Sequence, residues 1–161
     1  MKKRNMLLAL LLLLLVLLVG CGQEAKEESA PDAETYAFTD SAGRTVMIPK
    51  QIDRIAPSGG LAQMALFAIA HDRLVGVSGQ WKDTVLPFVG DRYRDLSVLG
   101  QFYGMKNFNK EAVLSVNPQI IIDVGEKKST IVEDMDQIQE SLGIPVIFIE
   151  ARLDNTDEAY R

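Results

Sequence analysis

The sequence predicts an α/β fold: a Rossmann-like three-layer sandwich in which helices cover both faces of a mostly parallel sheet. Two strand–helix–strand patterns and a preceding β-hairpin predict it. In the first pattern, short β-prone runs at 54–57 and 74–77 flank a helical segment at 61–70. In the second, apolar runs at 119–124 and 145–149 flank an amphipathic segment. Strands separated by a helix in this way pair in parallel through a right-handed crossover.

The hairpin comes first in the folded part. β-prone residues at 35–39 and 44–48 surround the tetrapeptide Asp40-Ser41-Ala42-Gly43, which is rich in turn formers. The helical segment that follows the next strand, 61–70, is apolar on nearly every side. Helices that are apolar all round are normally buried, so we expect this one inside the molecule.

The second strand–helix–strand unit has clearer boundaries. Residues 119–124 form a continuous apolar run, which is typical of a strand buried on both faces. Asn117 and Pro118 end the preceding helix, because proline cannot continue it, and that helix begins near Asn109. The run at 119–124 is therefore the best candidate for a central strand.

One apolar stripe marks the helix between the last two strands. Thr130 and Glu133 have the spacing of a capping box at its start, and Gly143 predicts its end. Apolar residues recur between them at helical spacing: Ile131, Met135, Ile138 and Leu142. The helix is expected to cover the sheet with this stripe.

The chain begins as an exported protein does. Lys2, Lys3 and Arg4 precede an apolar run, 6–19, whose 14 residues fall short of the span of about 20 that a bilayer requires. The sequence Leu18-Val19-Gly20-Cys21 resembles the lipobox of bacterial lipoproteins, in which the cysteine is acylated and becomes the mature N-terminus. Several acyl chains would hold the protein on the extracytoplasmic face of the cell membrane. The alternative is an ordinary secretory signal followed by a buried or free thiol.

Charge and composition divide the rest of the chain. Removing the signal at 1–20 takes away three positive charges and leaves 14 basic against 22 acidic residues, a net charge of −8 that argues against nucleic acid as a partner. Residues 21–34 are mostly small, polar or acidic, so we expect an acidic flexible tether there. The folded lobe is expected at 35–153. Cys21 is the one cysteine, so the lobe has no internal disulfide.

The expected strands end in loops that are candidates for a binding site. In open α/β sheets, ligands bind in the crevice outside the carboxyl ends of the strands. The loops that begin there are 58–60, 78–81, 100–104 and 125–127. The first precedes a helix, so its backbone amides could face an anionic or carbonyl group. The alternative is that the glycines only turn the chain and the aromatic side chains cover the core.

Six segments resemble, in order, the substrate-binding lipoproteins of iron-siderophore, haem and cobalamin importers of the ATP-binding-cassette (ABC) type. They are residues 36–49, 54–57, 72–78, 108–111, 117–122 and 143–148. Proteins of this family have two lobes joined by a long helix and hold the ligand between them. The resemblance implies that this chain is the first lobe of such a bilobal protein, a fragment or truncated product in which 154–161 begins the connecting helix. It also implies weak ligand binding by this chain alone, because half of the cleft is missing.

The resemblance implies a role in uptake, with no catalysis and no cofactor. The whole protein would capture a small-molecule metal chelate, with a ferric siderophore as first choice and haem or a corrinoid next. It would deliver the chelate to the transmembrane subunits of an ABC permease. The implied ligand-binding residues lie in the strand-end loops: Ser58, Gln80, Trp81, Phe102, Tyr103, Glu126 and Lys127. Acidic residues dock this family on its permease, and here the candidates are Asp95 and Glu111, although Glu111 also suits a helix start.

Two other interpretations remain open. A Rossmann-like nucleotide-binding enzyme domain would use 58–60 as its phosphate loop, but this loop lacks the Gly-x-Gly-x-x-Gly spacing and an acidic residue about 20 positions later. The other is a stand-alone lipid-anchored interaction domain. The one histidine, His71, is expected to lie at a helix end and not to bind a metal, since histidine sites usually need partner ligands.

Overall fold

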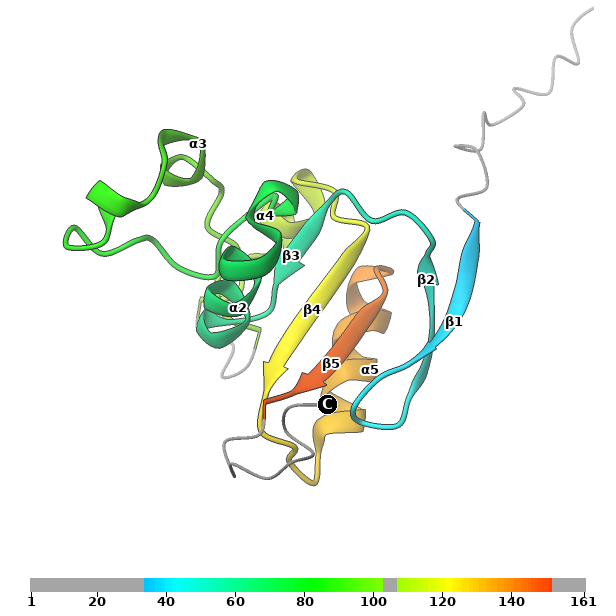
Figure 1. Cartoon of the computed structure of the whole chain (residues 1–161). Helices are drawn as coiled ribbons and strands as arrows, with labels where there is room; N and C mark the ends of the chain where they lie inside the picture. The colour runs from blue at the N-terminus through cyan, green and yellow to red at the C-terminus, as the bar shows by residue number, and fades with distance from the viewer. Residues whose placement is uncertain (1–33, 103–106, 152–161) are drawn as a thin grey trace, which may run out of the picture. The chain divides into compact units, whose positions relative to one another are not determined.

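The computed structural model describes residues 34–102 and 107–151 (Figure 1). The expected export signal, Cys21, the tether up to residue 33, Tyr103 and the 154–161 segment lie outside the described residues. No helix within the described ranges is long and apolar enough to cross a bilayer.

The predicted hairpin is confirmed. Strands β1 (Thr35–Thr39) and β2 (Thr45–Pro49) pair antiparallel, with Thr39 opposite Thr45 next to the turn. The carboxylate of Asp40 organises that turn, because its Oδ1 accepts hydrogen bonds from the amides of Ala42 at 3.0 Å and Arg44 at 2.9 Å. A residue of the predicted turn tetrapeptide, Asp40, therefore holds the turn through its side chain.

A three-stranded parallel sheet forms the centre of the lobe, in the order β3-β4-β5. Its strands are β3 (Ile55–Pro57), β4 (Ile120–Gly125) and β5 (Val146–Glu150). The middle strand β4 alternates between two apolar clusters, with Ile121 in one and Ile120 and Ile122 in the other. Both faces of the sheet are therefore covered, as predicted for a continuous apolar strand.

Helices from both crossovers cover both faces of the sheet (Figure 1). Helix α2 (Gly60–Ala70) contributes Leu66 to the cluster that contains Ile120 and Ile122. Helices α4 (Lys110–Ser115) and α5 (Ile131–Leu142) contribute to the cluster around Ile121. This arrangement is the predicted three-layer sandwich.

The predicted boundaries of the second unit are largely confirmed. The side chain of Asn109 caps α4 by accepting the amide of Ala112 at 2.9 Å. Gly143 ends α5 in a left-handed conformation with φ +67. The stripe of α5 is buried as expected: Ile131, Met135, Ile138 and Leu142.

The predicted capping box at the start of α5 is wrong. Thr130 is the residue before the helix, but its side chain makes no capping hydrogen bond. Its hydroxyl donates instead to the carboxylate of Asp134, at 3.0 Å. The Thr130 side chain is thus bonded to another side chain and not to the backbone at the helix start, and the paired capping bonds with Glu133 do not form.

Two predictions for the first unit are also wrong. Residues 74–77 form no strand and make only single parallel bridges, from Leu74 to Ile55 and from Val77 to Val98. The helix α2 is not buried all round, since Met64 is 68% and Ile69 81% exposed. Only one side of this helix meets the sheet, and the opposite side carries apolar residues without a covering layer among the described residues.

A buried arginine fastens the hairpin to the sandwich. The side chain of Arg44 is 7% exposed and its Nη1 lies 3.1 Å from Asp40 Oδ2. The same nitrogen donates to the carbonyl of Val146 on β5, at 2.9 Å, and Nε donates to Asp136 on α5, at 2.8 Å. One side chain therefore links the hairpin, a sheet strand and a helix.

Candidate functional site

A pocket of about 640 Å³ opens beside the amino-terminal half of α2. Its walls come from three segments of the chain: the one after β3, the one after Val77 and the one after Leu99. The stretches that lead into these segments run parallel to one another, as the bridges Ile55–Leu74 and Val77–Val98 show. The lining residues are Gly60, Gln63, Met64, Phe67, Ser78, Gly79, Gln80, Trp81, Lys82, Val85, Phe88, Val89 and Gln101. The pocket thus lies where the crevice rule for α/β sheets predicts it.

Most of the outer wall belongs to one excursion of the chain, residues 78–97, which we call the pocket loop. It includes the short 3₁₀-helix η2 (Leu86–Phe88) and the single helical turn α3 (Asp91–Arg94). It leaves and returns at one point, where the amide of Val77 donates to Ser97 O at 2.9 Å and the amide of Leu99 donates to Val77 O at 2.7 Å.

Aromatic side chains attach the pocket loop to α2. The ring of Phe67 lies 4.9 Å from that of Trp81 and 5.3 Å from that of Tyr93, the second contact at right angles. The indole nitrogen of Trp81 donates to the carbonyl of Tyr93 at 2.9 Å. Both geometries are the tilted and edge-on arrangements that aromatic pairs prefer. Phe67 is therefore the hub on which the aromatic wall rests.

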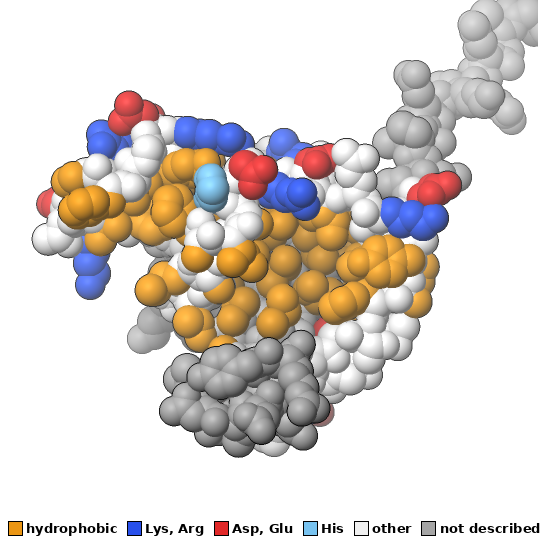
Figure 2. Space-filling model, in the orientation of Figure 1, with side chains coloured by type: hydrophobic (Ala, Val, Ile, Leu, Met, Phe, Trp, Pro, Cys, Tyr) orange, Lys and Arg blue, Asp and Glu red, His pale blue; other side chains and the backbone are white. Residues whose placement is uncertain are grey.

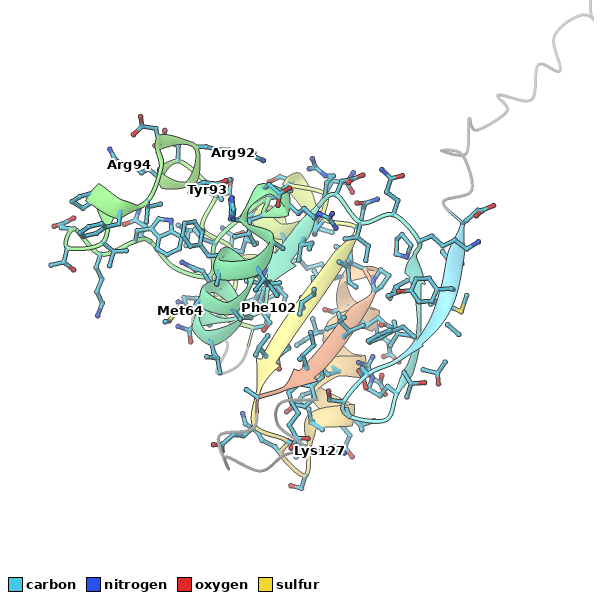
Figure 3. All side chains as sticks on the ribbon, in the orientation of Figure 1. Met64, Arg92, Tyr93, Arg94, Phe102 and Lys127 are labelled. Atoms are coloured by element: carbon cyan, nitrogen blue, oxygen red, sulfur yellow. The ribbon has the colours of Figure 1, made fainter. Side chains whose placement is uncertain are left out.

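One arginine attaches the pocket loop to the rest of the lobe and a second braces the loop internally (Figure 3). Arg92 donates to the carbonyl of Asp72 at 2.6 Å, and its guanidinium lies 5.6 Å from the ring centre of Tyr93. Arg94 donates to the carbonyl of Leu86 at 2.9 Å, within the loop. The loop is held by side chains, and hardly at all by strand pairing.

The polar floor of the pocket is built by Gln63. This side chain is 7% exposed, and its Oε1 accepts the amide and the hydroxyl of Ser78, both at 2.8 Å. The amide of Gly79 donates to the same oxygen at 3.2 Å. The donors at the start of the pocket loop are thus already used within the protein.

The rim of the pocket is apolar and open to solvent. Phe88 is 85% and Met64 68% exposed, and both line the pocket from different elements. Figure 2 shows apolar side chains gathered over α2 and the neighbouring loop, and Figure 3 shows Met64 on the outer side of α2. An exposed apolar rim around a hollow is a common feature of binding surfaces.

Glycine is required where Gln101 enters the pocket. The backbone of Gly100 has φ +82, and a Cβ on it would lie 1.9 Å from the carbonyl oxygen of Asn107. No side chain fits such a position. The turn carries Gln101 from the end of the short bridge at Val98 into the lining.

The sequence-predicted residues do not form one site. Gln80 and Trp81 line the pocket. Ser58 does not, since it is fully buried, its hydroxyl donates to the carboxylate of Asp123, and its amide donates to Ile122 O at 3.1 Å. Ser58 therefore offers no free amide to a ligand, and its polar groups join β3 to β4.

Phe102, expected at the ligand, lies in the core in this structure. Its side chain is 2% exposed and packs against Phe108, with ring centres 4.6 Å apart. This outcome is the alternative in which an aromatic residue of a strand-end loop covers the core. The amide of Phe102 donates to Ser58 O at 2.9 Å, which fixes the loop after Gly100.

The remaining candidates lie on the surface, away from the pocket lining. Glu126 and Lys127 follow β4, and Lys127 Nζ donates to the carbonyl of Ser41 in the hairpin turn at 3.3 Å (Figure 3). Asp95 is exposed directly after α3, and Glu111 is exposed in the first turn of α4. His71 follows α2 directly, as expected, and its ring lies 5.7 Å from that of Tyr93.

Sequence reasoning missed Gln63, Met64, Phe67, Lys82 and Phe88. One signal could have found Gln63: it is the only polar side chain in an otherwise apolar helix. The others lack such a signal. The rule that ligands bind outside the carboxyl ends of the strands predicts which loops line a site, but it does not predict which face of a neighbouring helix does so. Among the described residues, no group of three or more His, Cys, Asp or Glu side chains could hold a metal ion.

The fold matches solved structures of solute-binding proteins. The ABC transporter solute-binding protein of Sulfurospirillum deleyianum is matched with TM-score 0.59 and 22% identity, over 71% of this chain and 36% of that one. The periplasmic solute-binding protein of Veillonella parvula gives TM-score 0.57 and 20% identity, over 75% and 37%. The molybdate-bound periplasmic protein MolA of Haemophilus influenzae gives 0.53 and 21%, over 73% and 35%. No protein-family model and no curated protein matches the sequence.

The expected fold is thereby confirmed: the chain has the α/β fold of one lobe of a bilobal solute-binding protein. It spans between 35% and 37% of the length of these three structures, which fits an N-terminal lobe. The three neighbours are solute-binding or periplasmic binding proteins, one of an ABC transporter and one bound to molybdate.

Proposed function

We propose that this lobe belongs to an extracytoplasmic solute-binding lipoprotein that captures a metal chelate for an ABC permease and catalyses no reaction. The observation that carries the proposal is the pocket beside α2. It joins an aromatic wall, an apolar rim and a few polar groups at the carboxyl-end loops of a lobe with the solute-binding fold. Its volume of about 640 Å³ suits a bulky small molecule.

A ferric siderophore is the first-choice ligand, with haem or a corrinoid next. Each is large and carries apolar or aromatic surface, which matches the wall formed by Phe67 and Trp81. A bare metal ion suits the lobe less, since its described residues hold no cluster of metal ligands. A second lobe closing over the rim would bury the exposed Phe88 and Met64 together with the chelate.

The test is a fluorescence titration of the mature chain, residues 21–161. Trp81 is the only tryptophan, so the intrinsic emission reports the pocket directly. Ferric siderophores, haemin and a corrinoid are added separately, with the gallium complex of each siderophore as a control for light absorption by iron. We expect weak saturable quenching, with Kd of about 0.1 mM, because one lobe supplies half of the burial. If no chelate gives saturable quenching up to millimolar concentration, the proposal fails.

We also propose that Cys21 is acylated and holds the lobe at the membrane, with Asp95 and Glu111 as candidate contacts to the permease. The support is the lipobox-like sequence before Cys21 and the exposure of both acids. Metabolic labelling with a radioactive fatty acid should mark the full chain and should not mark the Cys21→Ala variant. Equal labelling of the variant would contradict the anchor.

A further inference from the structure

We propose that the pocket selects a negatively charged chelate that carries aromatic groups and whose metal is already fully coordinated, with Lys82 as the residue that recognises the charge. The inference rests on the proposed function and names the class of chelate. Three observations on the described lining carry it: its charge, its lack of carboxylate, imidazole, thiolate and phenolate groups, and the use of its hydrogen-bond donors at Ser78 and Gly79.

The charge of the described lining comes from one residue. Among the described residues that line the pocket, Lys82 is the only lysine, arginine or acidic residue. It is exposed, and its ammonium group makes no ion pair within the described ranges, where the basic partners are Arg44, Lys50 and Arg94. Its carbonyl accepts the amides of Val85 and Leu86, at 2.8 and 3.1 Å, which holds the backbone of this residue in place. The pocket therefore offers one uncompensated positive charge next to Trp81.

The described lining offers no carboxylate, imidazole, thiolate or phenolate ligand for a metal. It contains no His, Cys, Tyr, Asp or Glu, and its only sulfur is the thioether of Met64. Thioethers are soft ligands, whereas ferric iron in siderophores is held by oxygen atoms. Haem iron is usually held by a protein side chain such as histidine, cysteine or tyrosine. A chelate that fits this lining brings its complete set of oxygen ligands with it.

A small bare oxyanion also fits the lining poorly. Such an ion needs several converging hydrogen-bond donors. The hydroxyl and amide of Ser78 and the amide of Gly79 would be suitable, but all three donate to Gln63 Oε1. The lining also holds the side chains of Gln80 and Gln101, but most of its surface is apolar and includes the rings of Phe67, Trp81 and Phe88. Aromatic rings of a ligand would stack on these and place negative charge near Lys82.

The experiment measures binding of two ferric complexes to the mature chain, one anionic and one neutral: a tris-catecholate of charge −3 and a trihydroxamate without net charge. The proteins are the unchanged chain, Lys82→Gln, Lys82→Arg and the control Lys110→Gln, whose lysine lies on α4 and donates to Ser141 O. We expect Lys82→Gln to weaken tris-catecholate binding about fivefold at 0.1 M salt. Its effect on the trihydroxamate should stay below about twofold, because no net charge is involved.

We expect three further results. Lys82→Arg and Lys110→Gln bind the tris-catecholate as tightly as the unchanged chain does. The loss of affinity in Lys82→Gln becomes smaller as the salt concentration is raised. The visible charge-transfer band of the tris-catecholate keeps its wavelength when the complex binds. Equal weakening of both complexes in Lys82→Gln, or tighter binding of the neutral one by the unchanged chain, overturns charge selection. A shifted band overturns the claim of a complete coordination shell. If neither complex binds but haemin or a corrinoid does, the charge-selection proposal fails and the proposed function stands; if no chelate of any class binds, the proposed function itself fails.

Discussion

Replacing Asp40 with alanine should lower the free energy of unfolding by about 3–5 kcal/mol. The carboxylate of Asp40 is fully buried and pairs with Arg44, whose own side chain is 7% exposed. It also accepts the amides of Ala42, Arg44 and Phe148, the last at 3.2 Å. The substitution therefore leaves a buried guanidinium with less compensation and three amides without their acceptor. Urea denaturation followed by circular dichroism measures the change.

Asp136→Ala is the matched control, because it removes the other carboxylate bound to the same arginine. The side chain of Asp136 is 51% exposed, so water replaces much of what the ion pair contributes. We expect a loss of at most about 1 kcal/mol. Equal losses in the two variants would show that burial of the Asp40–Arg44 pair does not set the stability of the hairpin attachment.

Replacing Phe67 with alanine should have the largest effect on the pocket. The ring contacts Trp81 and Tyr93, so its removal takes away the support of the aromatic wall. We expect the free energy of unfolding to fall by about 2–3 kcal/mol, less than for a fully buried phenylalanine because Phe67 is half-buried. Chelate binding, measured by calorimetry, should weaken at least about tenfold, since the wall loses both a contact and its fixed geometry.

Phe88→Ala separates these two effects. Phe88 lines the same pocket but is 85% exposed, so its removal should change stability by less than about 0.5 kcal/mol. It should still weaken binding, by about twofold to fivefold, because the rim loses an apolar contact. A Phe67→Ala variant that binds as tightly as Phe88→Ala would contradict the role of Phe67 as the hub of the wall.

The features of the fold that follow from local pattern were predictable from the sequence. The turn at Asp40, the continuous strand β4, the stripe of α5 and its glycine end all depend on spacing within one segment. Apart from the capping box of α5, which fails within its own first turn, the failures depend on contacts between segments. Residues 74–77 have the composition of a strand, but Leu74 and Val77 make single bridges to different partners, so no continuous ladder forms.

The candidate site was predicted less well, for a physical reason. The rule that ligands bind outside the carboxyl ends of the strands predicted the position of the pocket and two of its lining residues, Gln80 and Trp81. It could not show that Phe102 packs inward and Phe67 sideways, because both are aromatic residues in apolar surroundings and only tertiary packing separates them. The role of Ser58 was unpredictable for the same reason. Its hydroxyl donates to the carboxylate of Asp123 on β4, a residue far away in the sequence.

The attachment of the pocket loop has a consequence for divergence between related proteins. The loop starts and finishes at the single bridge between Val77 and Val98, and its other supports are rings and arginine side chains. Because its two ends already lie together, changing its length adds little closure entropy and leaves the hydrogen bonds of β3, β4 and β5 untouched. Evolution can therefore replace this wall of the proposed binding pocket, while the sheet that supports it is inherited unchanged.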